Sequence, residues 1–432
     1  MNDQQPKPPI PGSGRPYPAA TVTDKARRLL AGGHVWVYAD EVIALTEIPE
    51  DGALVDIYNQ KNRYMGTGFY NSHSKIRIRL ISRNANDTFD EAFWERRIRY
   101  AVAYRRTVMA QDDTMGDSFA ACRLIFGEAD TFPGLTVDRF NNILVAQVLS
   151  LGIEKIKDIL FPALVRILRE EYGQTIDALY ERNDVAIREL EGMAQYTGYY
   201  THPSVDLKTE ADGLDGTTRI VENGILYTVD YVNGQKTGFF LDQKYNRRAI
   251  RAIAKGRRVL DCFTHTGSFG LNAAAGGALH VTSVDISADA LATATHNAAQ
   301  NGLSDKIDYV KADVFDYLRS LAVGRGAAPF DFIILDPPAF TKSRDTLRNA
   351  IKGYREINAL AMRMLPRGGY LATCSCSHFM TDTYFKQMLH NAAEDAGVTL
   401  RQIEARQQGP DHPILWNVPE TEYLGFYIFQ IV

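Results

Sequence analysis

The chain has 432 residues, of which 45% are hydrophobic, 23% charged and 10% aromatic; this composition is typical of globular proteins and excludes disordered, collagen-like and coiled-coil chains. At roughly 150 residues per domain, the length indicates about three domains. The net charge of −4 excludes a global positive field, so any nucleic-acid surface must be a local patch.

Residues 1–20 begin the chain with a polar, proline-rich segment. We expect a flexible leader there, because proline and glycine prevent regular structure, and the segment lacks the apolar core of a signal peptide. A run of about 20 apolar residues, as a membrane helix needs, does not occur. Four cysteines are too few for a disulfide scaffold. The sequence thus predicts a cytoplasmic protein that does not enter a membrane.

Short alternating segments in residues 21–95 predict a small β-barrel. In KIRIRLIS, apolar residues alternate with cations, which is the pattern of a strand with one buried face. The other face is either an ordinary solvated surface or a contact for RNA phosphates. The cations of this candidate RNA contact are Lys75, Arg77 and Arg79.

Residues 96–205 predict a small central α+β domain. The region opens in the arginine-rich helical pattern AFWERRIRYAVAYRRTV, and two strands flank the turn at Asn141-Asn142. A helix is expected over residues 153–171, followed by a strand near DALYER. The pattern alone does not give a role for this domain, although its arginines make it a second candidate for RNA binding.

Residues 206–432 alternate predicted strands and helices. Strands are expected at RVLDCF, HVTSVDIS, KIDYVKAD, FDFIILDPP, GGYLATCSCS and GFYIFQIV. Helices are expected over residues 268–275, 288–301, 314–322, 350–364 and 382–396. This alternation predicts an α/β domain with a doubly wound parallel sheet. Ligands of such sheets bind at the carboxyl ends of the strands.

The loop DCFTHTG, residues 261–267, follows the first of these strands and ends where a helix begins. Gly267 allows a ligand to approach the backbone closely, and the helix start presents free N–H groups. The loop matches neither GxGxxG nor a GK[ST] phosphate loop, which disfavours a dinucleotide site and nucleotide triphosphate hydrolysis.

Two further aspartates end the next two strands. Asp285 is placed to accept hydrogen bonds from ribose hydroxyls, and Asp313 is placed to bind an adenine edge. A single aspartate at such a position is more often a helix N-cap. With Asp261, however, three acids occur at three successive strand ends, which favours a nucleoside cofactor.

The segment DPPAF, residues 336–340, ends the fourth strand. Its two prolines fix a rigid, extended exit from the strand, which would present Asp336 to a flat ring with Phe340 stacked on it. A structural turn is the alternative interpretation. Asp-Pro-Pro after an apolar strand favours methyl transfer to a nitrogen or carbon of a planar group.

The segment TCSCS, residues 373–377, ends the fifth strand. A buried cysteine usually behaves as a small hydrophobic residue, but a thiolate at a strand end in a ligand cleft is able to add to an electrophilic ring carbon. The C-x-C spacing would also suit a metal ligand pair. Because His378 is the only other ligand type nearby, we expect no metal site.

These motifs resemble a known family. The third region is similar to class I S-adenosylmethionine-dependent methyltransferases. The whole chain after the leader resembles the PUA-containing large-subunit ribosomal RNA cytosine-C5 methyltransferases. The motifs that carry the resemblance are GHVWVYADEV, SKIRIRL, FGEADTFPGLTVDRF, NGQKTGFFLDQKYNRR, LDCFTHTGSFGLNAAAGGA, SVDIS, LDPPAF, TCSCS, and a late DHP followed by PETEYL.

The resemblance implies a PUA-like barrel, S-adenosylmethionine as cofactor, and methylation of a cytosine at carbon 5 in ribosomal RNA. It implies that Cys376 is the nucleophile and Asp336 its partner at the base. The expected cofactor-binding residues are Asp261, Phe263, Thr264, Thr266, Gly267, Asp285, Asp313, Gln243 and Arg247. The expected substrate-binding residues are Pro337, Pro338, Phe340, Lys75, Arg77 and Arg79.

Two departures from the family pattern concern the active site. Cys374 adds a second thiol, and Ala339 occupies a position where relatives often carry lysine, which puts the contacts near the target base in doubt. Three alternatives stay open: an RNA nitrogen methyltransferase acting at guanine N7 or an exocyclic amine without a cysteine nucleophile, a noncatalytic RNA-binding assembly factor, and a protein methyltransferase. The sequence gives neither the target nucleotide nor the oligomeric state, with which a homodimer is compatible.

Overall fold

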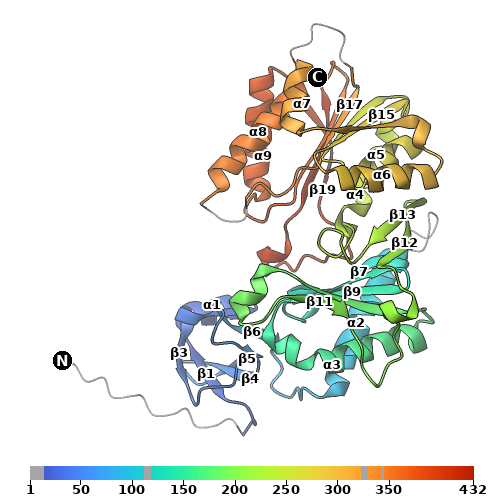
Figure 1. Ribbon diagram of the computed structural model, residues 1–432. Coiled ribbons are helices and arrows are strands. Elements are labelled where there is room, and N and C mark those ends of the chain that lie inside the picture. Colours follow the sequence, from blue (N-terminus) through green and yellow to red (C-terminus); the bar gives the residue numbers. More distant parts are fainter. Residues whose placement is uncertain (1–13, 111–117, 323–328, 342–344) are drawn as a thin grey trace.

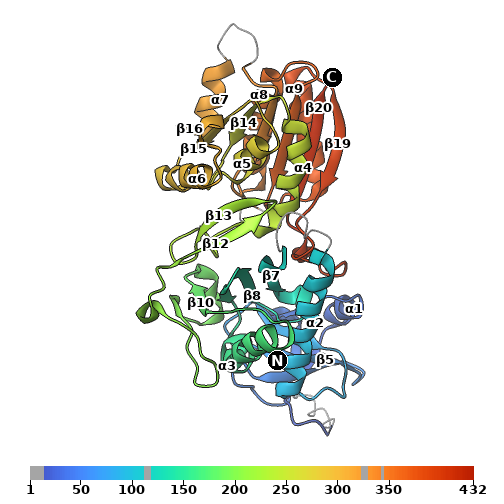
Figure 2. The same cartoon turned by 90° about the vertical axis from the view of Figure 1, so that its right-hand side faces the viewer.

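The computed structural model describes residues 14–110, 118–322, 329–341 and 345–432 (Figure 1). The chain forms two smaller amino-terminal domains and a larger α/β domain, which lies above them in the views of Figures 1 and 2. Within these ranges, none of the helices combines the length and the apolar character that crossing a bilayer would require.

The first domain is a six-stranded barrel-like sheet with the strand order β2-β6-β5-β4-β1-β3. Its elements are β1 (Ala19–Val22), α1 (Asp24–Ala31), β2 (Trp36–Tyr38), β3 (Val42–Leu45), β4 (Leu54–Asn59), β5 (Tyr64–Tyr70) and β6 (Ile76–Ser82). β1 begins inside the segment predicted as a flexible leader, because Ala19 and Ala20 are buried and β1 pairs with both β3 and β4. Arg15 also bonds Asp56 of β4 at 2.8 Å. Residues 14–20 are therefore part of the barrel, and residues 1–13 lie outside the described residues.

The central domain has a five-stranded sheet with the order β11-β10-β9-β8-β7. Its elements are α2 (Glu91–Met109), β7 (Ala121–Phe126), β8 (Leu135–Phe140), β9 (Ile143–Val148), α3 (Leu151–Arg166), β10 (Ala178–Asn183) and β11 (Tyr196–Tyr199). The turn predicted at Asn141-Asn142 is confirmed, since β8 and β9 form an antiparallel hairpin. α2 begins earlier than residue 96, because the Asp90 side chain caps it and Phe93 and Trp94 belong to the core of this domain.

A β-hairpin that the sequence pattern did not predict joins the central domain to the third. It consists of β12 (Thr217–Glu222) and β13 (Ile225–Asp230). Phe140 of the central sheet, Tyr227 of the hairpin and Phe269 of the third domain share one hydrophobic cluster. Burial of this shared apolar surface ties the two domains into one core.

The third domain has a seven-stranded sheet with the order β16-β15-β14-β17-β18-β20-β19. Its strands are β14 (Arg258–Cys262), β15 (His280–Asp285), β16 (Ile307–Lys311), β17 (Phe332–Leu335), β18 (Tyr370–Ser375), β19 (Leu400–Arg406) and β20 (Gly425–Ile431). Its helices are α4 (Lys244–Ala254), α5 (Ser268–Ala275), α6 (Ala288–Gln300), α7 (Val314–Ala322), α8 (Leu347–Met364) and α9 (Asp382–Ala396).

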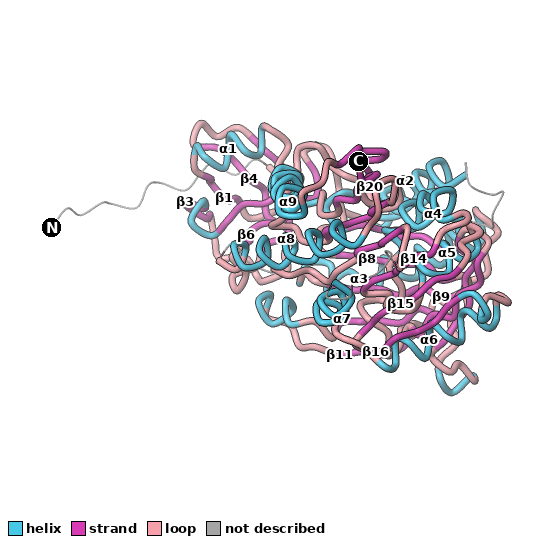
Figure 3. The backbone as a smooth tube through the Cα atoms, turned by 90° about the horizontal axis from the view of Figure 1, so that it is seen from above, coloured by secondary structure: helices cyan, strands magenta, loops and turns pink. Residues whose placement is uncertain are grey.

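This arrangement confirms the predicted doubly wound α/β fold, with α4–α6 on one face of the sheet and α7–α9 on the other (Figure 3). The helices expected over 268–275 and 314–322 have those bounds. The expectation of an entirely parallel sheet is corrected, because β20 runs antiparallel to β18 and β19. A parallel strand would need a crossover connection, usually a helix, and no α-helix separates β19 from β20.

Residues 407–424, which we call the connecting segment, join β19 to β20 by an excursion towards the two smaller domains (Figures 1 and 2). The backbone N–H of Arg123 donates to Asp411 Oδ2 at 3.0 Å, and Arg105 of α2 donates to the Asp411 carbonyl at 2.9 Å. His34 of the barrel lies 3.8 Å from Glu420. The connecting segment therefore contacts all three domains.

Candidate active site

The loop after β14 has an unusual backbone. Phe263, His265 and Gly267 have φ angles of 62°, 50° and 83°, and left-handed conformations are uncommon for residues other than glycine. The His265 N–H donates to Asp285 Oδ2 at 2.8 Å, so the loops after β14 and β15 are held together. The carboxyl edge of the sheet therefore carries a shaped loop, as the sequence predicted.

Asp261 holds this loop in place through hydrogen bonds. It is fully buried, and its Oδ2 accepts hydrogen bonds from Thr264 Oγ1, from Gly270 N at 2.8 Å and from Ser283 Oγ at 3.4 Å. Burial is the main cause that raises its pKa, to about 7. Asp261 thus shapes the cofactor loop through Oδ2.

The loop and its neighbours fit a nucleoside cofactor. Thr266 Oγ1 and Asp261 Oδ1 are buried oxygens without a hydrogen-bond partner among the described residues, and buried polar atoms are normally paired. Asp285 is half-buried at the end of β15. Asp313 is exposed, and its side chain accepts from Asp316 N at 3.1 Å at the start of α7. Asp313 is therefore a helix cap in the structure.

Gln243 and Arg247, both expected along the cofactor, make different contacts in the structure. Gln243, in the 3-10 turn η8 (Leu241–Gln243), donates from Nε2 to Asp336 Oδ1 at 3.1 Å and to Cys374 Sγ at 3.5 Å. Arg247 is buried and pairs with Glu222 of β12 at 2.6 Å. We correct the expectation for Arg247, because this buried side chain holds the β12–β13 hairpin; the cofactor contact of Gln243 stays a prediction, and its hydrogen bonds join it to the reaction centre after β17.

The half-buried Asp336 and the buried Cys374 form the inner part of the reaction centre. The Cys374 thiol donates to Asp336 Oδ1 at 2.9 Å and to the Leu335 carbonyl at 3.2 Å. Among the described residues, both side-chain hydrogen bonds of Asp336 are made by Oδ1. Burial is the first cause that raises the pKa of Asp336, to about 6.

Cys376 differs from the other cysteines in exposure. All four cysteines lie in the described part of the chain, and Cys376 alone is partly exposed. Its Sγ lies 3.8 Å from the Pro337 carbonyl, so the two strand-end motifs meet here. Burial and the Asp336 charge raise the pKa of Cys376 to about 12, whereas Lys236 lowers it.

Phe340 does not present its ring for stacking on a base. The ring packs against Tyr354, with centroids 4.5 Å apart, and against Phe315 and Phe263 at 5.9 and 6.5 Å. We therefore correct this expectation, because the ring fills the space between the DPPAF segment and α8. Pro337 is buried and Pro338 is exposed.

The predicted row of cations on β6 is only partly accessible. Lys75 is exposed, and Arg77 is half-buried and donates to the Asn71 carbonyl at 2.9 Å. Arg79 is only 8% exposed and pairs with Glu191 at 2.8 Å and Glu128 at 3.3 Å. The expectation that Arg79 contacts RNA is corrected, because the central domain covers that end of the strand.

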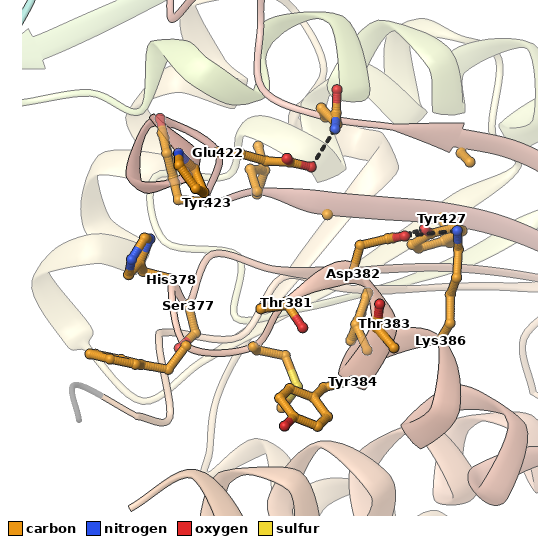
Figure 4. Close-up of a pocket in the computed structure, with 18 of the residues that line it drawn as sticks. Ser377, His378, Thr381, Asp382, Thr383, Tyr384, Lys386, Glu422, Tyr423 and Tyr427 are labelled. Carbon is orange, nitrogen blue, oxygen red and sulfur yellow. Dashed lines mark hydrogen bonds and ion pairs between the residues drawn. The ribbon is translucent and has the colours of Figure 1, made fainter. Parts of the chain in front are cut away.

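A cleft of about 920 Å³ adjoins the TCSCS segment, and its lining begins at Ser377, the residue after Cys376. Ser377 and His378, which follow the cysteine directly, lie on one side of it, and Glu422 and Tyr423 of the connecting segment lie on the other (Figure 4). The cleft thus lies between the segment that follows Cys376 and the connecting segment.

Lys236 is a site residue that the sequence reasoning missed. It has a φ of 53°, is exposed, and its ammonium lies 4.8 Å from the centre of the Phe240 ring. Phe240 in turn packs against His265 of the cofactor loop. The available signal was its place in NGQKTGFFLDQKYNRR, between Gly234 and Gly238.

Comparisons with known proteins agree with this architecture. Residues 202–419 match the S-adenosylmethionine-dependent methyltransferase family, and residues 20–83 match the PUA-like domain family. Two solved structures superpose on 95% of this chain and 99% of their own, at 22% identity, and share its fold. One, from Streptococcus mutans, is described as an S-adenosylmethionine-dependent methyltransferase and has a TM-score of 0.76. The other, a methyltransferase in complex with SAH, has a TM-score of 0.77.

Two relatives are both called ribosomal RNA large subunit methyltransferase I. That of Pseudoalteromonas translucida is 38% identical over 401 residues, covering 92% of this chain and 95% of the relative. That of Photobacterium profundum is 40% identical over 396 residues, covering 91% and 94%. The predicted fold and the predicted cofactor are thereby confirmed. The chain belongs to the ribosomal RNA large subunit methyltransferase I family, and it is an S-adenosylmethionine-dependent methyltransferase with a PUA-like domain.

Proposed function

We propose that this protein methylates carbon 5 of a cytosine in large-subunit ribosomal RNA through a covalent bond to Cys376. The name of the relatives supports the RNA substrate. The observation that carries the chemistry is the partly exposed Cys376 thiol beside the DPP motif. Its partial exposure leaves this thiol within reach of an incoming base, whereas the other three cysteines are buried.

The contacts of Cys374 support its exclusion as the nucleophile. It is fully buried, and its thiol proton is shared between Asp336 Oδ1 and the Leu335 carbonyl. Burial and the Asp336 carboxylate raise its pKa well above the ordinary value of a thiol. Cys374 therefore serves to orient Asp336, together with Gln243.

Asp336 suits the role of a proton donor to the base. Its Oδ1 is occupied by Gln243 and Cys374, which leaves Oδ2 for the ring nitrogen and amino group of cytosine. With its pKa raised to about 6, a fraction of the carboxyl is protonated near neutral pH. A pKa near the working pH is favourable for acid–base catalysis.

S-adenosylmethionine, when bound, supplies a methyl group activated by a sulfonium. The Cys376 thiolate adds to carbon 6 and forms a C–S bond, while Asp336 passes a proton to nitrogen 3, so that carbon 5 gains the electron density of an enamine. After carbon 5 carries the methyl group, a base removes its proton. The electron pair restores the C5–C6 double bond, the C–S bond breaks, and nitrogen 3 returns its proton to Asp336.

The cofactor is held by the loop after β14, with Thr266 and Asp285 as its polar contacts. The smaller domains hold the RNA, and Lys75 of the barrel is an exposed cation for a phosphate. The target cytosine must be unpaired or flipped out to reach Cys376. Single-stranded loops and bulges, the usual targets of sequence-specific RNA recognition, already meet this condition.

One observation favours a second candidate function. A cysteine whose pKa is raised to about 12 is a weak nucleophile before substrate binds. The same DPP motif would serve methyl transfer to an RNA nitrogen, at guanine N7 or an exocyclic amine, with both cysteines as bystanders. This candidate requires no covalent adduct.

Trapping of the covalent adduct tests the proposal. In RNA that carries 5-fluorocytidine, carbon 5 has no proton to lose, so the C–S bond cannot break after methyl transfer. We expect the wild type and Cys374→Ser to form a denaturation-resistant adduct with such large-subunit ribosomal RNA, and Cys376→Ala to form none while binding S-adenosylmethionine normally. An adduct in Cys376→Ala, or none in the wild type, would contradict the cysteine mechanism.

A further inference from the structure

Trp416 is the most exposed large aromatic side chain among the described residues, with 95% of its surface accessible to water. The other two tryptophans are packed: Trp94 is 2% exposed, and Trp36 is half-buried with its indole N–H bonded to Glu128 at 2.9 Å. An indole normally buries a large apolar area in a core or an interface. Its full exposure on the surface therefore requires a functional explanation.

The exposure of Trp416 does not come from a loosely held loop. The Val418 N–H donates to the Leu415 carbonyl at 2.8 Å across a turn that has Trp416 and Asn417 at its centre. Thr421 fastens both ends of this turn, because its Oγ1 accepts from Leu415 N at 2.8 Å and donates to the Val418 carbonyl at 2.7 Å. The indole is thus held out into solvent by a braced backbone.

The turn lies between the barrel and the cleft that adjoins the TCSCS segment. Asn417 packs so closely on the barrel that a Cβ at Gly33 would overlap its side chain. On the other side, Pro419 and Glu420 line the cleft together with Ser377 and His378, which follow Cys376. An RNA strand that contacts both the barrel and this cleft would lie beside the turn.

We propose that Trp416 is a stacking site for an unpaired nucleobase that flanks the methylated nucleotide. The inference rests on the proposed RNA substrate. Flipping a target base leaves its neighbours partly unstacked, and an exposed indole offers such a base a flat apolar surface. Aromatic stacking of this kind is the usual way in which proteins hold single-stranded RNA, and it tolerates every base.

A nucleobase fits this position better than a phosphate. The carboxylates on the same segment are Glu420, which is paired with His34, the buried Asp411, and the exposed Glu422, which accepts a hydrogen bond from Gln407. None of the three supplies a cation, so the segment attracts RNA through the ring and not through charge. The cationic contacts would come from the barrel.

Fluorescence separates Trp416 from the other tryptophans. The difference between the emission of the wild type and of Trp416→Phe reports the exposed indole alone, and binding is followed independently by the anisotropy of an end-labelled, unmodified large-subunit ribosomal RNA transcript. We expect saturating RNA to quench this component and to protect it from acrylamide. Trp416→Ala should bind the transcript about 10-fold more weakly, and Trp416→Phe should recover most of the loss. S-adenosylmethionine affinity should stay unchanged in both.

Leu279→Ala is the matched control, since this exposed apolar residue (68% accessible) precedes β15 at the opposite edge of the sheet. It should bind RNA as the wild type does. If the wild type binds RNA while Trp416 emission stays unchanged, or if Trp416→Ala binds within twofold of the wild type, the stacking site is refuted and the proposed function stands. If the wild type binds no RNA, both fail. A dimer that Trp416→Ala dissociates would instead assign the indole to a subunit interface and overturn the inference.

Discussion

Asp261 and Asp336 make an instructive pair, because Asp261 lies near the end of β14 and Asp336 directly follows the neighbouring parallel strand β17, at the same edge of one sheet. Asp261 is buried and Asp336 is half-buried, and desolvation raises the pKa of both, to about 7 and about 6. They differ in how their oxygens are used. Three donors from the cofactor loop and its surroundings occupy one oxygen of Asp261, whereas Asp336 bonds Gln243 and Cys374 through Oδ1 and adjoins the partly exposed Cys376.

The comparison distinguishes a carboxylate that shapes a loop from a carboxylate that takes part in the reaction. A carboxylate that gathers donors from its own loop determines the backbone of that loop. A carboxylate whose donors come from two other elements, η8 and β18, is oriented by them and keeps one oxygen for a ligand. A raised pKa therefore occurs in both roles and does not tell one role from the other. Substitutions at the two positions should accordingly have different consequences.

The largest expected effect is at Cys376. Cys376→Ala should lower single-turnover methylation by about 10⁴-fold or more, because the covalent route is lost. Cys374→Ala should lower it by only about 5- to 10-fold, since Asp336 then loses one of two donors. Single-turnover rates at saturating RNA measure both. Equal losses in the two variants would break the distinction between them.

Asp336→Asn should lower turnover by about 10²- to 10⁴-fold, because the amide cannot pass a proton to the base.

The same substitution should also raise the free energy of unfolding at high pH. The native pKa of about 6 lies about 2 units above the ordinary 3.8. Ionised Asp336 therefore lowers the free energy of unfolding by about 3 kcal/mol. This penalty is present above pH 6, decreases as the pH falls, and is absent below about pH 4. Urea unfolding at pH 8 and pH 4 tests it; a variant less stable than the wild type at pH 8 would contradict the assignment.

Asp261→Asn should have the opposite effect on stability. An amide nitrogen in place of Oδ2 would face the donors Gly270 N and Thr264 Oγ1, and an unpaired buried donor costs about 1–3 kcal/mol. We expect a lower unfolding free energy at neutral pH together with weaker binding of S-adenosylmethionine, seen by urea titration and calorimetry. Unchanged cofactor affinity would mean that the loop keeps its shape without Asp261.

The smallest effect is expected at Thr266. Because its buried Oγ1 has no partner among the described residues, Thr266→Val should weaken S-adenosylmethionine binding by about 10-fold and leave unfolding unchanged. Thr264→Val is the matched control, since it removes a hydrogen bond to Asp261 and should lower stability. Normal cofactor affinity in Thr266→Val would remove Thr266 from the cofactor site.

The features that sequence reasoning predicted well depend on neighbouring residues. The apolar strand cores and the helix starts lie within a few residues of one another, and the helices over 268–275 and 314–322 were predicted with their observed bounds. The strand-end motifs were placed correctly for the same reason. Parallel strands bring their carboxyl ends to one edge, so Asp261, Asp336 and Cys376 meet once the alternation of strands and helices is recognised.

The features that were missed depend on residues far apart in the chain. Arg79 forms a buried ion pair with Glu128 and Glu191, and both of these carboxylates come from the central domain. Gln243 reaches Asp336 across 93 positions, and Phe340 packs against α8. Periodicity in one segment carries no information about which distant side chain covers it, so a cation or an aromatic residue next to a motif is easily assigned to a ligand.

Nucleoside mass spectrometry tests the central claim most directly. Unmodified large-subunit ribosomal RNA is incubated with the protein and isotopically labelled S-adenosylmethionine, and the RNA is then digested to nucleosides. We expect the label in 5-methylcytidine, and none with Cys376→Ala. Label in a methylguanosine or a methyladenosine would keep the fold and the cofactor but contradict the cysteine mechanism.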